Sequence, residues 1–442
     1  MAEIKSFYGI RYDRTRFDDE QMARLVAPPY DVIDEAGQDE LYERHPQNIV
    51  RLDLNRHQPG DHAENNRYTR SRRHLMDWLA TGVMKLDGSP AIYVHVQDFD
   101  DETGRRHTRK GFVALARLAD YEEGIVLPHE RTLRGPKIDR LELMKATECN
   151  LSQVFFLYDD EERKVDALLF DESRAPYVVD LTTDDGVRHK IWPIFDEEIH
   201  RLVAAQLDGG PLLIADGHHR YETALAYRDF RREVAEEPNP DAPYEYTMGF
   251  FVNVHDPGLE VFPTHRVVHG VDGFDADALR KRLKSSPLFE LEELGPDALA
   301  SAAGLKTTLE EAGAKNPSFV LAAHNLSPLL VRYVGDETAD IFDAETPPEV
   351  RRLDVAVLHE GILDRLLGIS KEAQEAKTNL KYIKGLAPAI EAVEDPTHQL
   401  VVLMNPTPVE QVSEVCLSGG KMPQKSTFFY PKILSGLVIN PL

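Results

Sequence analysis

A short apolar run that ends in a polar turn is the feature that most constrains the fold of this chain. Leu212 to Ala215 has the length and composition of a buried strand, and it breaks at Asp216-Gly217. An apolar-periodic helix pattern begins almost at once. The sequence therefore predicts that the segment Asp-Gly-His-His-Arg lies at a strand-to-helix turn.

This turn has the chemistry of an anion site. The free backbone N–H groups and the dipole at a helix N-terminus favour negative charge. Arg220 adds a permanent cation in the first helical turn, and its guanidinium is suited to bidentate hydrogen bonding to phosphate. In the alternative interpretation, Gly217 only serves a tight turn and the two histidines are satisfied locally.

Length and charge narrow the class of protein. With 442 residues the chain is longer than a usual single domain, so two or three domains are expected. The net charge of −25 repels nucleic-acid backbones and anionic membranes. Basic clusters such as Arg70-Ser71-Arg72-Arg73 are short and typical of a solvated face. We therefore expect neither nucleic acid nor a membrane as a partner.

The cysteines and the amino terminus point to a cytoplasmic protein. Cys149 and Cys416 are far apart and lack the spacing of a metal or redox site, so both are expected to be free thiols. The first residues contain no basic and apolar export signal, and no apolar run is long enough to span a bilayer. The sequence leaves the oligomeric state open, a homodimer included.

Helix and strand patterns alternate along the chain, which predicts an α/β or mixed α+β class. Three units are expected: an N-terminal α/β unit (1–120), a catalytic core (121–269) and a C-terminal α/β unit (270–442), whose last segment, 421–442, returns to the active site. Expected strands are 4–12, 91–99, 111–118, 154–158, 212–215, 246–254, 319–324, 329–334 and 400–404. Expected helices are 18–26, 65–79, 139–147, 160–169, 196–207, 276–284, 296–303 and 350–367.

Two further motifs carry chemistry. Glu130, in Pro128-His129-Glu130, directly follows an apolar run, and partial desolvation makes such a carboxylate a better proton acceptor and a candidate general base. A glutamate in a surface loop is the alternative. Lys425-Ser426-Thr427 offers a cation and two hydroxyls, which either contact phosphate or begin the apolar strand that follows. Gly419-Gly420-Lys421 lacks the spacing of a P-loop.

Other polar groups have open interpretations. Lys137 and Arg140, beside Asp139, are either phosphate contacts or a surface salt-bridge cluster. His265 and His269 share helical spacing, but their neighbours indicate a strand, so a metal pair is not expected. Asp31, after a double proline that disfavours helix, is a turn residue or faces the cleft.

Three motifs together resemble the free-serine kinases (SerK), which belong to the ParB and sulfiredoxin superfamily. They are Pro128-His129-Glu130, Asp216-Gly217-His218-His219-Arg220 and Pro423-Gln424-Lys425-Ser426-Thr427, in the same order. The whole chain, including Ala27-Pro28-Pro29-Tyr30-Asp31, is also similar to a widespread bacterial family labelled as a domain of unknown function. The kinase resemblance covers about residues 124–442 and implies a ParB/sulfiredoxin-like catalytic core.

The resemblance implies a small-molecule kinase that transfers a phosphate from ATP or ADP, with Mg²⁺, to the hydroxyl of free L-serine, giving O-phosphoserine. Glu130 is then the base, and Asp216 and His219 are also catalytic. Residues implied to bind nucleotide or phosphate are Gly217, His218, Arg220, Lys425, Ser426 and Thr427. Residues implied more weakly to contact substrate are His129, His265 and Arg266. No protein-held metal site is implied.

The sequence also departs from the kinases and leaves alternatives. The separation between Glu130 and Asp216 implies an insertion around 159–189, and residues 1–120 are an addition that can alter substrate choice. One alternative is a ParB-like nucleotide-binding switch without amino-acid kinase activity, whose first unit contacts a partner. Another is a metal-dependent hydrolase that uses Asp216, His218 and His219, although adjacent histidines on one helical turn point in different directions.

Overall fold

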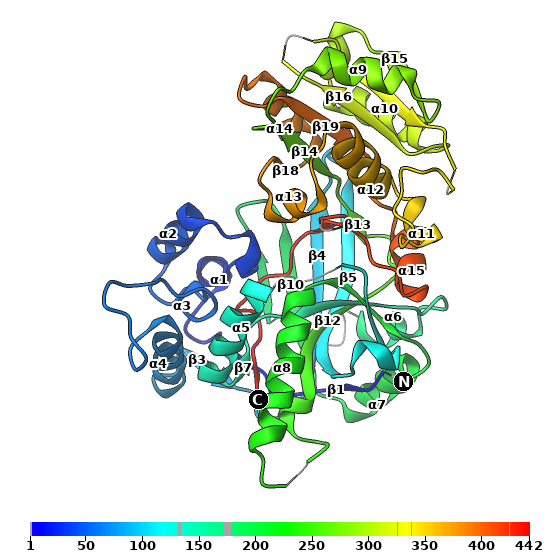
Figure 1. Cartoon of the computed structure of the whole chain (residues 1–442). Coiled ribbons are helices and arrows are strands. Elements are labelled where there is room, and N and C mark those ends of the chain that lie inside the picture. Colours follow the sequence, from blue (N-terminus) through cyan, green and yellow to red (C-terminus); the bar gives the residue numbers. More distant parts are fainter. Residues whose placement is uncertain are drawn as a thin grey trace.

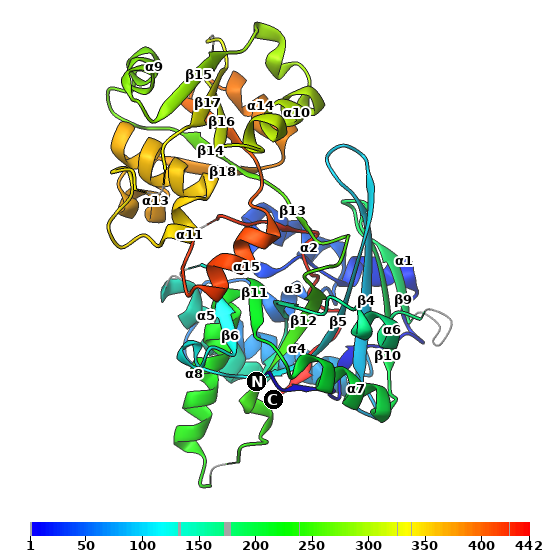
Figure 2. The ribbon, with the colours of Figure 1, turned by 90° about the vertical axis from the view of Figure 1, so that its right-hand side faces the viewer.

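The chain forms a larger lower body and a smaller upper lobe (Figures 1 and 2). The structure, a computed structural model, describes residues 2–130, 134–171, 178–237, 239–324, 326–336, 338–423 and 425–442. Both parts combine helices with sheets, so the mixed α/β class predicted from the sequence is confirmed. Gln424 of the third motif lies outside the described residues.

A nine-stranded mixed sheet forms the centre of the lower body, in the order β6-β11-β8-β12-β5-β4-β10-β9, with β1 paired to β5. Its strands are β1 (Ile4–Lys5), β4 (Ile92–Asp100), β5 (Arg106–Arg117), β6 (Val126–Pro128), β8 (Val154–Tyr158), β9 (Val179–Thr182), β10 (Arg188–Ile194), β11 (Leu212–Asp216) and β12 (Tyr246–Asn253). All five residues of β8 are buried, which is typical of a strand covered on both faces. Because β5 pairs with β12, the predicted units 1–120 and 121–269 share one sheet.

Helices cover this sheet, and α5 packs against both α4 and α8 (Figure 1). The helices of the lower body are α1 (Asp19–Leu25), α2 (Glu35–Arg44), α3 (Val50–Asp53), α4 (Arg67–Ala80), α5 (Arg134–Thr147), α6 (Lys164–Leu169), α7 (Glu197–Leu207) and α8 (His218–Val234). Its short strands are β2 (Ile10–Tyr12), β3 (Met84–Leu86), β7 (Cys149–Asn150), β13 (Glu260–Val261), β20 (Phe429–Tyr430) and β21 (Asn440–Pro441).

The upper lobe contains a six-stranded sheet in the order β15-β17-β16-β19-β14-β18, in which every pairing is antiparallel. Its strands are β14 (Thr264–Val268), β15 (Phe289–Glu293), β16 (Ser318–Ala322), β17 (Leu329–Tyr333), β18 (Leu380–Lys384) and β19 (Leu400–Met404). Its helices are α9 (Ala276–Ser285), α10 (Ala302–Gly313), α11 (Pro348–Arg351), α12 (Asp354–Ala356), α13 (Lys371–Ala376) and α14 (Leu386–Glu391); α15 (Val409–Leu417) follows below the lobe.

Several predicted elements differ in their bounds. The strand expected over 4–12 is broken into β1 and β2. The helix expected over 296–303 is a 3₁₀ turn at Pro296–Leu299, followed by α10. The helix expected over 350–367 is divided into α11, α12 and a π-helical segment, Val357–Leu366.

The chain after α15 runs from the upper lobe across the lower body to its end beside β7 (Figure 1). Two fully buried side chains hold this segment against the large sheet. Arg109 donates from Nη1 to the carbonyl of Tyr430 at 3.2 Å, and Gln97 donates to the carbonyl of Lys432 at 3.4 Å. The carboxy-terminal segment is therefore part of the interior of the lower body.

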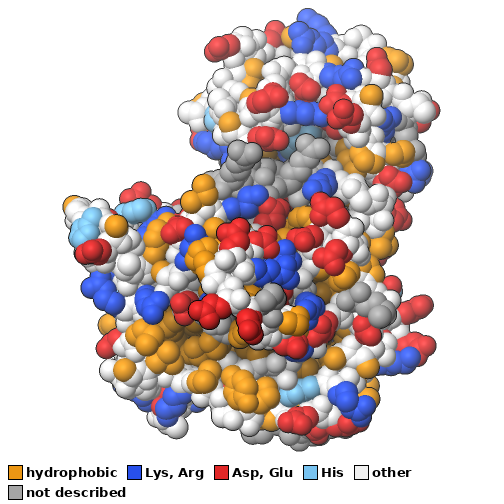
Figure 3. All heavy atoms as spheres, turned by 60° about the horizontal axis from the view of Figure 1, so that its bottom comes forward, with side chains coloured by type: hydrophobic (Ala, Val, Ile, Leu, Met, Phe, Trp, Pro, Cys, Tyr) orange, Lys and Arg blue, Asp and Glu red, His pale blue; other side chains and the backbone are white. Residues whose placement is uncertain are grey.

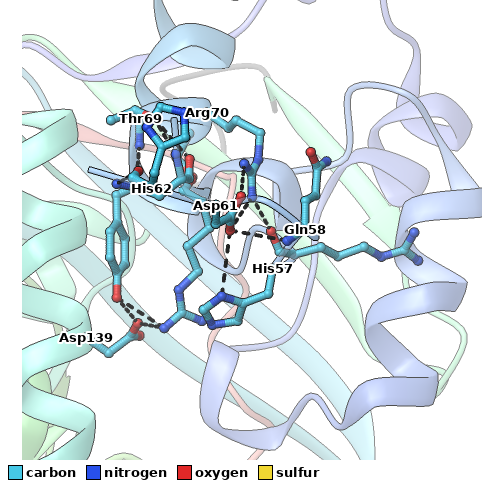
Figure 4. A network of polar contacts seen from close by, with 12 residues as sticks. His57, Gln58, Asp61, His62, Thr69, Arg70 and Asp139 are labelled. Atoms are coloured by element: carbon cyan, nitrogen blue, oxygen red, sulfur yellow. Dashed lines mark hydrogen bonds and ion pairs between the residues drawn. The ribbon is translucent and has the colours of Figure 1, made fainter. Parts of the chain in front are cut away.

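Ion pairs join α4 to α5 and to the loop before α4 (Figure 4). Arg70 forms a two-pronged contact with Asp61, at 2.6 and 3.0 Å, and the hydroxyl of Tyr68 donates to Asp139 at 2.8 Å. Arg140, only 7% exposed, donates to the same Asp139 and to the carbonyl of Asp53. A salt-bridge cluster is thus present around Asp139, but Arg140 is buried inside it rather than at the surface, and Lys137 pairs separately with Glu222.

Acidic side chains are spread over the molecular surface seen in Figure 3 and are interspersed with basic ones. Both cysteines are buried free thiols. Within the described parts of the chain, every helix is too short or too polar to cross a membrane.

Candidate functional site

Two parallel strand ends bring the first two motifs together. β6 and β11 pair in parallel, with Pro128 opposite Ile214. His129 and Glu130 follow β6, as Asp216 ends β11, and neighbouring strands lie about 4.8 Å apart. The sequence-predicted strand, turn and helix are all present, since β11 leads through Gly217 into α8. Residues separated by 86 positions in the sequence therefore share one edge of the sheet.

His129 and His218 form hydrogen bonds that connect the segments at this edge of the sheet. The Nδ1 atom of His129 lies 2.8 Å from the carbonyl oxygen of Ile214, which can only accept, so Nδ1 carries the proton. Its Nε2 then accepts from the hydroxyl of Thr427 at 2.9 Å. The Nε2 atom of His218 accepts the backbone N–H of His129 at 3.3 Å.

Both rings are buried and neutral. Burial lowers the pKa of His129, and burial together with the neighbouring His129 lowers the pKa of His218 well below its ordinary value. The two imidazoles meet edge to face, with centroids 4.7 Å apart. The geometry gives His129 and His218 a bracing role, rather than the phosphate or substrate contacts expected from the sequence.

Asp216 is held between two cations. Its Oδ2 lies 2.8 Å from Arg220, and its Oδ1 lies 3.2 Å from the Nζ of Lys432. Burial alone would raise the pKa of Asp216, but Lys432 and Arg220 lower it well below its ordinary value. Arg220, 7% exposed, also donates to the carbonyl of Gln153. Its guanidinium braces the turn from inside the protein, which differs from the predicted fork onto phosphate.

Gly217 is required by this arrangement. Its φ of +91° lies in the region that disfavours side chains, and an added Cβ would come within 2.9 Å of the Arg220 guanidinium. We expect Gly217→Ala to lower the free energy of unfolding by about 1–3 kcal/mol. Urea unfolding measures this, with Gly210→Ala as control, because a Cβ at Gly210 meets no atom within 4 Å. Equal stability of the two variants would contradict the strained turn.

Glu130 lies where the upper lobe and the carboxy-terminal segment meet the strand ends. Its Oε1 accepts the backbone N–H of Ser426 at 3.2 Å, and its side chain is 19% exposed. The preceding carbonyl, of His129, accepts the N–H of Met422 at 2.7 Å. No described residue donates a hydrogen bond to the second carboxylate oxygen. Glu130 is thus anchored through one oxygen.

Lysines from two distant segments converge beside this edge. The Nζ atoms of Lys384, in β18, and Lys432 lie 4.1 and 4.4 Å from the centre of the Phe428 ring. Burial, and then the positive charges of Lys432 and Lys425, lower the pKa of Lys384 to about 8. We call Lys384, Lys425 and Lys432 the lysine cluster. Crowded like charges of this kind suit a polyvalent anion.

Asp31 also faces this edge. It is exposed, and its charge acts on His219, Arg220 and Lys384. Asp31 lies in the 3₁₀ turn Tyr30–Val32, as the turn interpretation expects, and its charge also acts on the lysine cluster. His219 is half-buried nearby, and burial lowers its pKa. Lys384 and Lys432 were missed because nothing in the local sequence links them to the turn.

The other predicted site residues have diverse positions. Lys425 has an exposed side chain and a positive φ of 60°, whereas Ser426 is buried and donates to the carbonyl of Pro423 at 2.5 Å. Arg266, fully buried, donates to the carbonyl of Lys425 at 3.1 Å. His265 lies on the other face of β14, because side chains alternate along a strand. It is fully buried, and its Nδ1 accepts the N–H of Met404 at 3.2 Å.

Among the described residues, no group of three or more His, Cys, Asp or Glu has the arrangement to hold a metal ion by itself. Mg²⁺ in phosphate chemistry needs only one or two carboxylates, because phosphates and water supply the other ligands. Asp31 and Asp216 are the carboxylates near the lysine cluster.

Several solved structures are similar to this chain over much of its length. A variant of free serine kinase in complex with AMP is 14% identical, covers 69% of this chain and 84% of its own, and gives a TM-score of 0.35. A conserved hypothetical protein from Pyrococcus furiosus is 15% identical, with coverages of 70% and 89% and a TM-score of 0.33. SbnI with a C-terminal truncation, from Staphylococcus aureus, is 9% identical, with coverages of 73% and 85% and a TM-score of 0.35.

Likeness at this level transfers no activity to this chain. No curated protein matches the sequence. The family profile described as "Protein of unknown function (DUF1015)" matches residues 4–356, which is most of the chain. The chain belongs to the DUF1015 family.

Proposed function

We propose that this protein is a small-molecule kinase that transfers the terminal phosphate of a nucleotide to a hydroxyl group. The observation that carries the proposal is that a partly buried carboxylate, Glu130, is hydrogen-bonded to the residue that follows Lys425 of the lysine cluster. Glu130 is tied to Ser426, and the cluster is contributed by the neighbouring Lys425 and Lys432 together with Lys384. A phosphoryl-transfer site needs donors for the phosphates and a base for the acceptor in this proximity.

Each group has a role in the proposed reaction. The lysine cluster and the N-terminus of α8 bind the phosphates, which helix N-termini favour. Glu130 accepts the proton of the acceptor hydroxyl while its oxygen bonds to the terminal phosphorus and the bond to the leaving nucleotide breaks. Asp216 orients Lys432, and Asp31 and Asp216 are the residues that would supply carboxylate oxygens to a Mg²⁺ ion, which would neutralise charge on the phosphates.

The finer assignment rests on the three motifs shared with the free-serine kinases. On that basis we propose free L-serine as the first acceptor to test, with ATP or ADP as donor. A catalytic role for His219, and the relation to the ParB and sulfiredoxin superfamily, belong to the same proposal. His218, Arg220, Ser426 and Thr427 are proposed to hold the site in shape.

The direct test is product formation. The purified full-length chain is incubated with Mg²⁺, L-serine and either ATP or ADP, and O-phosphoserine is measured by mass spectrometry. We expect product with one of the two donors and none without the protein. Absence of product together with absence of nucleotide binding would eliminate the kinase.

Nucleotide affinity is expected to fall above pH 8 because Lys384 loses its charge there. Its pKa of about 8, lowered first by burial, means that the cation is present below that pH and lost above it. Each pH unit above 8 then weakens binding by up to about tenfold. Calorimetric titration of ATP or ADP from pH 7 to 9.5 measures this dependence.

Lys384→Arg is the matched control, since arginine stays charged throughout this range. Its affinity is expected to stay nearly constant where that of the unmodified protein falls. The same pH dependence in both proteins would show that Lys384 does not contact the nucleotide.

A nucleotide-binding switch is the second candidate. The position of Asp31 favours it, because a residue of the N-terminal unit faces the lysine cluster and can respond to a bound nucleotide. A change in oligomeric state with nucleotide, measured by light scattering and independent of any amino acid, would support this alternative.

A further inference from the structure

A cavity lies close to Glu130, because its lining includes Met422, whose N–H binds the carbonyl of the preceding His129. It has a volume of about 650 Å³ and lies between the upper lobe and the chain around Met422. Its lining includes Tyr382. The guanidinium of Arg266 lies 5.3 Å from the centre of the Tyr382 ring. Burial raises the pKa of Tyr382, and the charge of Glu130 raises it further. We call this cavity the lobe cavity.

The strand β18 relates this cavity to the lysine cluster. Tyr382 and Lys384 are two residues apart, so their side chains share one face of β18 about 7 Å apart along the strand. Their partners in β14 are Arg266 and Thr264. A molecule in the lobe cavity would therefore lie one strand repeat away from a phosphate bound at Lys384.

A chain of hydrogen bonds fixes the inner wall of the cavity to Glu130. His359, which lines the cavity, accepts at Nε2 from Arg266 at 3.1 Å. Arg266 donates in turn to the carbonyl of Lys425 at 3.1 Å, and the next N–H, of Ser426, binds Glu130. Burial and Arg266 lower the pKa of His359 to about 3, so this ring is neutral. The wall is rigid and adds no charge at His359.

The charge of the lining is negative. Ionisable residues of the lining, apart from His359, are Asp343, Glu345, Glu360, Glu375, Lys371 and Lys421. Four carboxylates against two lysines leave two unbalanced negative charges. The cavity therefore favours a cationic group.

Glu360 is the buried carboxylate of this negatively charged lining. It lies on the π-helical segment Val357–Leu366, and π-helical turns occur often at functional sites. It is 7% exposed, and its carboxylate accepts the N–H of Asp343 at 2.8 Å and the hydroxyl of Thr346 at 3.0 Å. Lys371, a cation of the lining, lies 3.9 Å away and is itself paired with Asp343. Buried charges are normally paired closely, and a ligand ammonium would complete this one.

We infer that the lobe cavity is the acceptor subsite of the proposed kinase and that it takes a hydroxyl compound that carries a cationic amine and is larger than free serine. The inference rests on the proposed function. Cavities of about 300–1,000 Å³ are typical of ligands well above the size of one small amino acid. The hydroxyl lies at the Tyr382 end beside Glu130, and the amine lies at Glu360.

Binding without nucleotide tests the ligand class. Calorimetry with the dipeptide seryl-lysine is compared with the same dipeptide acetylated at both amines, which removes its cations. We expect only the unmodified dipeptide to bind. Glu360→Gln is expected to weaken its binding about 10- to 100-fold, the loss expected for a charge-assisted contact.

Two further variants test the same inference without relying on Glu360→Gln, which could lower binding simply by disturbing the fold. The exposed pair Glu345→Gln with Glu375→Gln is expected to weaken binding several-fold, because it lowers the negative charge at the rim. Glu311→Gln, exposed on α10 and outside the lining, is the control and is expected to bind as the unmodified protein does. Equal binding of both dipeptides, or equal affinity of all variants, would overturn the inference.

Transfer assays separate this inference from the kinase itself. Phosphorylation of seryl-lysine with a lower KM than L-serine supports both proposals. Phosphorylation of L-serine with no preference for the cationic dipeptide overturns the lobe cavity as acceptor subsite and leaves the kinase intact. Charge-selective binding without transfer from either nucleotide eliminates the kinase, and with it the acceptor role, and leaves only the ligand class.

Discussion

Replacing Glu130 by glutamine is expected to lower the rate of phosphoryl transfer by about 10²–10⁴, the usual contribution of a general base. Glutamine keeps an oxygen that accepts the N–H of Ser426, so the local geometry is retained. It cannot accept the proton of the acceptor hydroxyl. We therefore expect kcat to fall while the affinity for nucleotide, which depends on the lysine cluster, changes little.

The measurement is steady-state turnover with the acceptor that gives most product, together with calorimetric titration of nucleotide. Glu260→Gln is a matched control, since this partly exposed carboxylate pairs with His107 at 3.1 Å and is outside the proposed site. It should retain turnover within a few-fold. Full turnover by Glu130→Gln would remove Glu130 as the base, whatever the acceptor proves to be.

The strand-to-helix turn was predictable because its determinants are local. Apolar residues over 212–215, a glycine, and a helical pattern within a few positions specify a strand, a turn and a helix without distant contacts. Even the positive φ of Gly217 follows from the need for a tight turn between them. The mixed α/β class was predictable for the same reason, since it depends only on alternation of such patterns.

The directions of the side chains were not predictable from this pattern. The sequence shows that Arg220 and His218 lie in the first turn of α8, but burial decides that both point into the protein. In β14 the two-residue period shows that His265 and Arg266 face opposite ways. Only the pairing of β14 with β18 and β19 decides which of them, here Arg266, faces Glu130.

The lysine cluster depends entirely on tertiary structure. Lys384 comes from a sheet of the upper lobe and Lys432 from the segment that crosses the lower body, and no motif surrounds either residue. Their convergence follows from the crossing itself, which Arg109 and Gln97 fix through backbone carbonyls. Sequence reasoning had found only Lys425 of the three, because it lies beside the two hydroxyls of its motif.

The protein is expected to lose several kcal/mol of stability between pH 6.5 and 5.5. Six buried histidines have lowered pKa values, with burial as the largest cause in each: His95, His129, His189, His218, His265 and His359. The pKa is about 3 for His189, His265 and His359. In the unfolded chain an ordinary histidine takes up its proton near pH 6.5.

The direction of the stability change follows from this difference between the histidine pKa values of the folded and unfolded chain. Above pH 6.5 both states are neutral and the folded state keeps its full stability. Below pH 6.5 these histidines bind protons in the unfolded chain but not in the folded chain. This difference lowers the free energy of unfolding by up to about 1.4 kcal/mol per histidine for each pH unit. Because an unfolded histidine is only half protonated at pH 6.5, the loss from pH 6.5 to 5.5 is about 1 kcal/mol for each histidine with a strongly lowered pKa. The five such histidines, which are all of the six except His129, give about 5 kcal/mol, a large part of the stability of a typical domain.

Two buried aspartates act in the opposite direction. Burial raises the pKa of Asp256 to about 6 and that of Asp354 to about 7, so the folded state gains protons there as the pH falls. Together the two aspartates raise the free energy of unfolding by at most about 2–3 kcal/mol between pH 6.5 and 5.5. The histidines outweigh them, and the net effect remains a loss of stability on acidification.

Urea unfolding at pH 7.5, 6.5 and 5.5 measures this loss as a falling midpoint. His265→Leu is expected to reduce it by about 1 kcal/mol between pH 6.5 and 5.5, because it removes one of these histidines from a buried setting in which Nε2 has no described partner. The variant also leaves the Met404 N–H without its acceptor, so its stability at pH 7.5 falls while its pH dependence becomes shallower. His57→Leu, at a side chain 74% exposed, is the control and should keep the original slope. An unfolding midpoint that is constant from pH 7.5 to 5.5 would mean that these histidines accept protons in the folded state, and the neutral bracing of His129 and His218 would have to be abandoned.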